Sequence, residues 1–281
     1  MKKFLKKIPL IRWFLDIRRE LSMIRFELSK QTRIQQHLFR EIVSKSNANL
    51  HKEFPSAFEH QTYSQNGEDG VIQEIFRRVD LSHGTFVEIG TGDGYENNTR
   101  LLLELGWKGV WVEGDETSCE TARKNLAKFI DSGQLSIINS FVTPENVNRV
   151  LEEEDVPKDV DLLSLDIDMH THHVWEKLEY LNAKFAVVEY NGFFPHSALW
   201  QSKYIEGESW DGTINMGASL EELTDIGSKK DFRLIGCELT GTNAFFASRV
   251  LAEKYFPDRE DTNNLYEPSR HFLLNDPEHQ K

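Results

Sequence analysis

The chain has 281 residues, of which 39% are hydrophobic and 28% are charged, and its formal net charge is −13. This length suits one α/β domain with an appendage, and the apolar fraction is sufficient for a hydrophobic core. No apolar run is long enough to cross a bilayer. The two cysteines, Cys119 and Cys237, match no metal or redox spacing, so a reducing, cytoplasmic compartment is expected.

The charge is divided unevenly along the chain. Residues 1–45 contain 12 Lys and Arg against 4 Asp and Glu, whereas the remainder is strongly acidic. An acidic body repels phosphate backbones, which argues against a nucleic-acid partner. The basic head is suited to peripheral contact with anionic lipid at the inner face of a membrane.

Residues 1–47 are predicted to form a long, basic, amphipathic helix. Apolar residues recur at alternating steps of four and three, at Leu10, Phe14, Ile17, Leu21, Ile24 and Leu28, and again at Leu38 and Ile42 after two seam glutamines. This spacing is typical of a coiled-coil seam and predicts a homo-oligomer formed through the helix. A single helix lying on the following domain is the alternative. Residues 48–60 are polar and are predicted to be a linker.

Residues 61–256 alternate between helix and strand patterns. The predicted strands are Thr85–Ile89, Gly109–Glu113, Leu135–Asn139, Asp161–Asp166 and Phe185–Glu189. The predicted helices are Gly67–Val79, Asn98–Leu105, Ser118–Ser132, Pro144–Glu153 and Val174–Leu181. Such alternation predicts a Rossmann-like α/β fold, with a mostly parallel sheet covered by helices on both faces. The β-rich runs Phe232–Glu238 and Asn243–Ser248 predict a closing antiparallel hairpin. Residues 257–281 are interpreted as a polar C-terminal extension.

A glycine-rich turn follows the first predicted strand, with the spacing Glu88-x-Gly90-x-Gly92-x-Gly94. Glycines there permit a tight turn and the close approach of a ligand. The spacing differs from the G-x-G-x-x-G of dinucleotide binders, whose third glycine serves a pyrophosphate. Glu88 suits a ligand with an ammonium group and no phosphate. Glu113 ends the next strand, where its carboxylate can accept both hydroxyls of a ribose, so the pattern favours S-adenosylmethionine (SAM).

Several segments resemble the class I SAM-dependent methyltransferase superfamily, and within it the FkbM-type branch. The segments that carry the resemblance are residues 63–70 (YSQNGEDG), the glycine turn, and residues 111–115, 140–147, 163–168, 188–191 and 243–246. The resemblance covers roughly residues 60–250. It implies a seven-stranded sheet with one antiparallel strand and SAM at the carboxyl ends of the first strands. It also implies that Gln65 and Asp69 lie over the methionine end of SAM and that Ser140 and Phe141 border its adenine.

The function implied is transfer of a methyl group from SAM to a hydroxyl, most often of a sugar in a bacterial surface polysaccharide or its precursor. A non-catalytic coiled-coil scaffold that retains the fold is one alternative, and an NAD-dependent oxidoreductase is another. The glycine spacing speaks against the second alternative.

The segment Asp166-Ile167-Asp168-Met169-His170-Thr171-His172-His173 departs from the family pattern, which reads D-I-D-G-N-D-Y-W. Two interpretations stay open. In one, His170 or His172 is a general base that takes the acceptor's proton, together with Asp166. In the other, a divalent metal such as Mg²⁺ or Mn²⁺ assists the reaction, as in catechol-type O-methyltransferases. Its ligands would be Asp166, Asp168, Glu189 and Asn191.

A long connection, Gly192–Gly217, follows the fifth predicted strand. Long loops inside compact domains are usually functional. The residues that could stack on a sugar or close a pocket are Phe193, His196, Trp200, Tyr204 and Trp210. A hydrophobic lid without substrate contact is the alternative.

Overall fold

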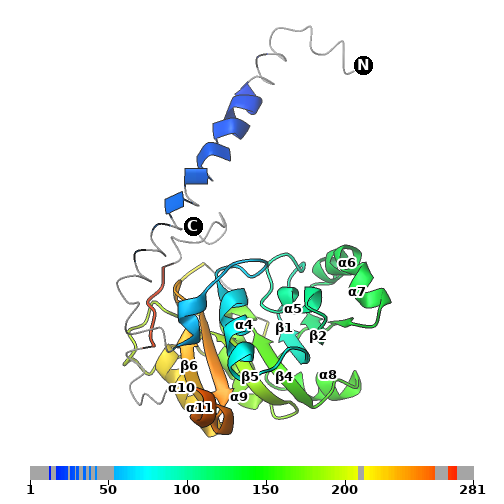
Figure 1. Cartoon of the computed structure of the whole chain (residues 1–281), viewed down its shortest axis with the longest axis vertical. Coiled ribbons are helices and arrows are strands. Elements are labelled where there is room, and N and C mark those ends of the chain that lie inside the picture. Colours follow the sequence, from blue (N-terminus) through cyan, green and yellow to red (C-terminus); the bar gives the residue numbers. More distant parts are fainter. Residues whose placement is uncertain are drawn as a thin grey trace.

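The computed structural model describes residues 54–207, 212–256 and 265–270, together with scattered residues between positions 13 and 42. Within this part of the chain, seven strands form one sheet in the order β3-β2-β1-β4-β5-β7-β6 (Figure 1). The strands are β1 (Thr85–Ile89), β2 (Lys108–Glu113), β3 (Leu135–Asn139), β4 (Asp159–Leu165), β5 (Asn182–Glu189), β6 (Phe232–Cys237) and β7 (Asn243–Ser248).

The first five strands pair in parallel, whereas β7 runs antiparallel to both β5 and β6. The predicted mostly parallel α/β sheet and its closing antiparallel hairpin are therefore confirmed. The strand order places β1 and β4 at the centre, so the ends of these two strands lie side by side at the carboxyl edge of the sheet.

Helices cover both faces of the sheet (Figure 1). One face carries α4 (Glu68–Arg78), α5 (Arg100–Glu104), α6 (Glu116–Asn125), α7 (Ala127–Asp131) and α11 (Arg249–Tyr255). The other carries α8 (Val147–Glu153), α9 (Thr171–Lys177) and α10 (Leu220–Lys229). Side chains alternate along β1. Phe86 therefore packs under the helices of the first face, whereas Val87 and Ile89 pack under α8, α9 and α10 on the other face.

Two predicted helices differ from the observed ones. The predicted helix Ser118–Ser132 is divided into α6 and α7 at Leu126. The predicted helix Val174–Leu181 is displaced, because a 3-10 turn, η2 (Asp168–His170), leads directly into α9, which ends at Lys177. Beyond that end the Asn148 Oδ1 atom accepts the backbone N–H groups of Glu179 and Tyr180, and these bonds hold the chain outside the helix.

The predicted N-terminal helix and linker fall mostly outside the described residues. Residues 17–24 are helical, and the seam residues Leu21 and Ile24 are 53% and 55% exposed. The coiled coil and the homo-oligomer stay predictions. Residues 48–53 of the linker are not described, whereas Phe54 is buried and begins a 3-10 turn, η1 (Pro55–Phe58), that packs against α4. None of the described helices is long and apolar enough to span a membrane.

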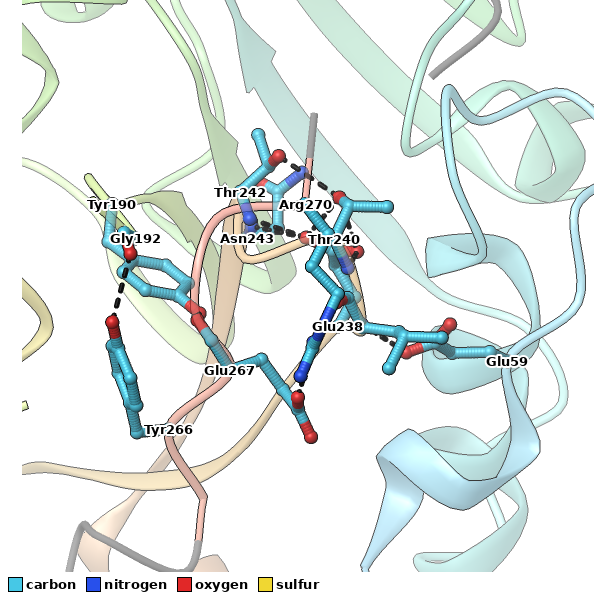
Figure 2. Close-up of polar contacts among 11 residues, drawn as sticks. Glu59, Tyr190, Gly192, Glu238, Thr240, Thr242, Asn243, Tyr266, Glu267 and Arg270 are labelled. Atoms are coloured by element: carbon cyan, nitrogen blue, oxygen red, sulfur yellow. Dashed lines mark hydrogen bonds and ion pairs between the residues drawn. The ribbon is translucent and has the colours of Figure 1, made fainter. Parts of the chain in front are cut away.

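Residues 265–270, which belong to the predicted C-terminal extension 257–281, pack against the sheet domain (Figure 2). The Tyr190 hydroxyl donates to the Glu267 carbonyl oxygen at 2.5 Å, and the Tyr266 hydroxyl donates to the Gly192 carbonyl oxygen at 2.9 Å. The Arg270 N–H bonds to the Thr240 carbonyl oxygen at 2.7 Å. This segment therefore fixes the start of the connection that follows β5, next to the carboxyl edge of the sheet.

Candidate functional site

A cavity of about 900 Å³ opens at the carboxyl ends of β1, β2, β3 and β4. In open α/β sheets this edge is where ligands bind. Of the predicted site residues, the lining includes Gly90, Gly92, Glu113, Ser140, Phe141, Asp166, Asp168 and His170. The structure thus brings the glycine turn, the acid of the second strand and the acidic segment after β4 to one place.

The glycine turn lies so close to neighbouring parts of the protein that side chains would not fit at two of its positions. Gly90 has a φ of +85°, and a Cβ there would lie 1.6 Å from the backbone oxygen of Asp166. Gly94 has a φ of +83°, and a Cβ would lie 2.9 Å from the Trp111 ring. Because L side chains rarely adopt these φ values, glycine is required at both positions. At Gly92, which also lines the cavity, a Cβ would meet nothing within 4 Å, so this side of the turn is open.

The Glu88 side chain extends from β1 but does not line the cavity. Its carboxylate accepts the N–H groups of Asn98 and Thr99 at 3.0 and 3.2 Å, and also the Thr99 hydroxyl. These amides are at the start of α5, so Glu88 neutralises the helix N-terminus from inside the protein. Burial raises the pKa of Glu88 to about 7. Its predicted contact with the ammonium group of SAM stays a prediction, because Glu88 does not line the cavity.

Glu113 is fixed at the rim by backbone donors. Its Oε2 atom accepts the Gly92 N–H at 2.6 Å, and its Oε1 atom accepts the Asp115 N–H at 2.8 Å. Each carboxylate oxygen has a second lone pair that can still accept a hydrogen bond. Opposite it, the Phe141 ring is 62% exposed and lies against the cavity. A Cβ at Gly114 would lie 3.0 Å from that ring, so the missing side chain makes room for it.

Gln65 and Asp69 do not line the cavity. The Asp69 Oδ2 atom accepts the N–H groups of Thr62, Tyr63 and Ser64, at 2.7 to 2.8 Å. The backbone oxygen of Gln65 accepts the Gln61 amide. Asp69 therefore organises the segment before α4, and the roles of both residues in cofactor binding stay predictions.

Asp166 and Glu189, at the ends of the neighbouring strands β4 and β5, form a carboxyl pair. Their side chains hydrogen-bond to each other, and burial raises the pKa of Asp166 to about 7. Burial, and then the charge of Asp166, also raises the pKa of Glu189 well above its ordinary value. The pair therefore holds a proton near neutral pH.

The predicted metal ligands do not fit a cation site. The Asn191 side chain donates to the backbone oxygens of Ile214 and Met216, both at 2.8 Å, and its Oδ1 atom accepts the Phe193 N–H. Asn191 is thus occupied in organising the loop after β5. Among the described residues, no group of three His, Cys, Asp or Glu side chains is placed to hold a metal ion.

The two histidines predicted as bases lie in different environments. His170 lines the cavity and is 8% exposed, and neither of its ring nitrogens has a hydrogen-bond partner among the described residues. His172 is fully buried behind it, and its Nε2 atom lies 3.3 Å from the Ser202 carbonyl oxygen. Burial lowers the pKa of His172 to about 3, so its ring is neutral. Only His170 can therefore reach a molecule in the cavity.

The long connection after β5 supplies one wall of the cavity through Tyr204. The Tyr204 hydroxyl donates to Glu145 Oε2 at 3.2 Å, and its ring meets His170 edge-on at 4.9 Å. Trp200 instead stacks on Phe194, and His196 packs near Tyr266. Phe193 is 52% exposed outside the lining, and Trp210 is outside the described part of the chain.

The lining also contains residues that were not singled out from the sequence, among them Asp93, Tyr95, Glu96, Asp115 and Thr143. Tyr95 and Glu96 directly follow the last glycine of the turn, and Asp115 follows Glu113 by two residues. Their positions just after strand ends were a usable signal, because such residues collect at the ligand-binding edge of the sheet.

Comparison with known proteins gives fold-level likenesses only. No family model matches the sequence, and no curated protein matches it. The N-terminal domain of EvdMO1, solved with SAH bound, is 10% identical over 75% of this chain and 96% of that one, with a TM-score of 0.45. A Staphylococcus aureus protein assigned as a caffeoyl-CoA O-methyltransferase is 15% identical over 80% of this chain and 99% of that one, with a TM-score of 0.44. The pyocyanin biosynthetic protein PhzM is 17% identical over 62% of this chain, with a TM-score of 0.37, and the chain spans 53% of its length. These values are low, so function is argued from the site.

The raised pKa of Glu88 predicts a pH-dependent stability. The folded state holds the Glu88 proton up to about pH 7, whereas the ordinary value is 4.5, so the folded state loses stability as pH rises through this interval. We expect the stability of the wild type relative to Glu88→Gln to fall by about 3 kcal/mol between about pH 4.5 and pH 8. Urea denaturation at several pH values measures this difference.

Glu74→Gln is the matched control. Hydrogen bonds from Arg77 lower the pKa of Glu74, so the wild type should gain stability relative to this variant as pH rises from acid. A pH-independent difference for Glu88→Gln would show that folding does not raise the pKa of Glu88.

Proposed function

We propose that this chain is a SAM-dependent O-methyltransferase that acts on a hydroxyl group, with a sugar as the acceptor. The observation that carries the proposal is the cavity in which the Gly90–Gly94 turn, Glu113 and Phe141 lie together. The open space beside the Gly92 α-carbon suits close approach of the methionine part, the Glu113 carboxylate suits a ribose, and the exposed Phe141 ring suits an adenine.

A dinucleotide fits this site poorly. In NAD-binding folds a pyrophosphate lies on the N-terminus of the helix that follows the glycine turn. Here the amides of Asn98 and Thr99 at the start of α5 are already bound by the Glu88 carboxylate. A pyrophosphate would also meet the carboxylates of the lining, so the site favours the sulfonium cofactor over NAD.

SAM supplies a methyl group on a positively charged sulfur, which needs no further activation. The methyl carbon–sulfur bond breaks as the carbon–oxygen bond forms, and the bond's electron pair stays on sulfur. The protein must align the acceptor oxygen and remove its proton. His170 is the histidine best placed for this role, because it lines the cavity and neither of its ring nitrogens has a hydrogen-bond partner among the described residues.

Glu113→Gln is expected to weaken SAM binding by roughly 10-fold to 100-fold, because hydrogen bonds to a charged carboxylate are worth about 1.5–3 kcal/mol. Isothermal titration calorimetry with SAM measures the change. Glu116→Gln, which alters an exposed acid of α6 outside the lining, is the matched control and should bind as the wild type does. Equal affinity in all three proteins would refute the role of Glu113, and no binding to the wild type would refute the proposed function.

His170→Ala is expected to lower SAH formation by about 100-fold or more on an accepted hydroxyl substrate, while SAM affinity stays unchanged. Turnover is followed by SAH release over a panel of mono- and oligosaccharides. Addition of imidazole should partly restore the activity of His170→Ala, because the variant opens space beside the acceptor. Full turnover in this variant would exclude His170 as the base and leave the Asp166–Glu189 pair in that role.

A further inference from the structure

Within the described part of the chain, the cavity lining carries acidic side chains and no lysine or arginine. Among the described residues, the lining contains Asp93, Glu96, Glu113, Asp115, Asp166 and Asp168, and it contains no Lys or Arg. Even with Asp166 sharing a proton with Glu189, five carboxylates face one cavity. A cleft lined by one sign of charge concentrates counter-ions and repels ions of the same sign.

Two basic side chains of the neighbouring helices are paired away from the cavity. Arg100 and Lys128 both bond to Glu104, on the helices of one face and away from the lining. Burial lowers the pKa of His173, which lies behind the wall with His172, so neither ring supplies positive charge near neutral pH. Within the described lining, the carboxylates are therefore the acidic charge that no lysine or arginine of the same lining balances.

The cavity also presents a buried polar group that needs a ligand. His170 is 8% exposed and lines the cavity, and both of its ring nitrogens lack a partner among the described residues. A buried polar atom without a partner is costly, and because both nitrogens are enclosed, a bound molecule supplies the missing hydrogen bond once the ring turns toward the cavity.

We propose that the site takes uncharged or cationic hydroxyl acceptors, such as neutral sugars and amino sugars, and rejects acceptors with a phosphate or carboxylate close to the reacting hydroxyl. This inference rests on the proposed function and narrows its substrate class. SAM carries one net positive charge and offsets one carboxylate only. A sugar phosphate or a uronic acid would place a further negative charge beside Glu96 and Asp168.

The potential can be measured with a thiol reporter in the lining. Tyr95 is 65% exposed and lines the cavity, whereas both native cysteines are buried, so Tyr95→Cys introduces one accessible thiol within the described structure. Its reaction rates are measured with a cationic, a neutral and an anionic methanethiosulfonate reagent, with and without SAH. Val250→Cys on α11, where Val250 is 71% exposed and outside the lining, corrects for the intrinsic reactivity of the reagents.

We expect the cation-to-anion rate ratio at the Tyr95→Cys thiol to exceed that at the Val250→Cys thiol by roughly tenfold or more. High salt should reduce the excess, because it screens exposed charges. Adding Glu96→Gln or Asp168→Asn to the reporter should lower the ratio, whereas Glu116→Gln should leave it unchanged. If Tyr95→Cys fails to fold, Phe141→Cys, on the opposite wall, replaces it as the reporter.

Equal ratios at the two thiols would overturn the inference, and so would a ratio unaffected by Glu96→Gln and Asp168→Asn together. Calorimetry with SAH on the same proteins separates this failure from that of the proposed function. If SAH binds but the cation-to-anion rate ratios at the two thiols are equal, the methyltransferase proposal stands and the proposed preference for uncharged or cationic acceptors is refuted. A high ratio without SAH binding removes the methyltransferase proposal, and with it the acceptor class inferred here.

Discussion

The candidate site depends on the contact between the end of β1 and the end of β4. The Asp166 N–H bonds to the Ile89 carbonyl oxygen at 3.0 Å, and the next residue along β1, Gly90, leaves no room for a Cβ against the Asp166 backbone. This close approach turns the glycine segment across the sheet edge and brings Asp166 to the same cavity as Glu113. A side chain at Gly90 would separate the two strand ends, and with them the two halves of the site.

Much of this arrangement could be predicted from the sequence. Alternating strand and helix patterns fixed the parallel sheet, and the glycine spacing located the turn, because both depend on local chain geometry. Residues directly after strand ends, such as Glu113, Asp166 and Asp168, could be placed at one edge for the same reason.

The rest depended on contacts between residues far apart in the chain. Glu88 was predicted to contact the cofactor. Side-chain alternation along β1 directs its carboxylate to the backbone N–H groups at the start of α5, and this contact was not predicted. Asn191 was predicted as a metal ligand, yet its side-chain amide donates hydrogen bonds to backbone oxygens more than twenty residues later in the chain. The packing of residues 265–270 beside β5 could not be read from a polar tail, because tertiary partners decide it (Figure 2).

A crystal structure of the protein grown with SAH tests the central claim most directly. The account predicts SAH in the cavity at the carboxyl edge, with its ribose hydroxyls on the Glu113 carboxylate and its adenine against Phe141. The acceptor side, next to the His170–Tyr204 ring pair, should stay open to solvent. An empty cavity at saturating SAH, or SAH bound at another place on the protein, would contradict the account.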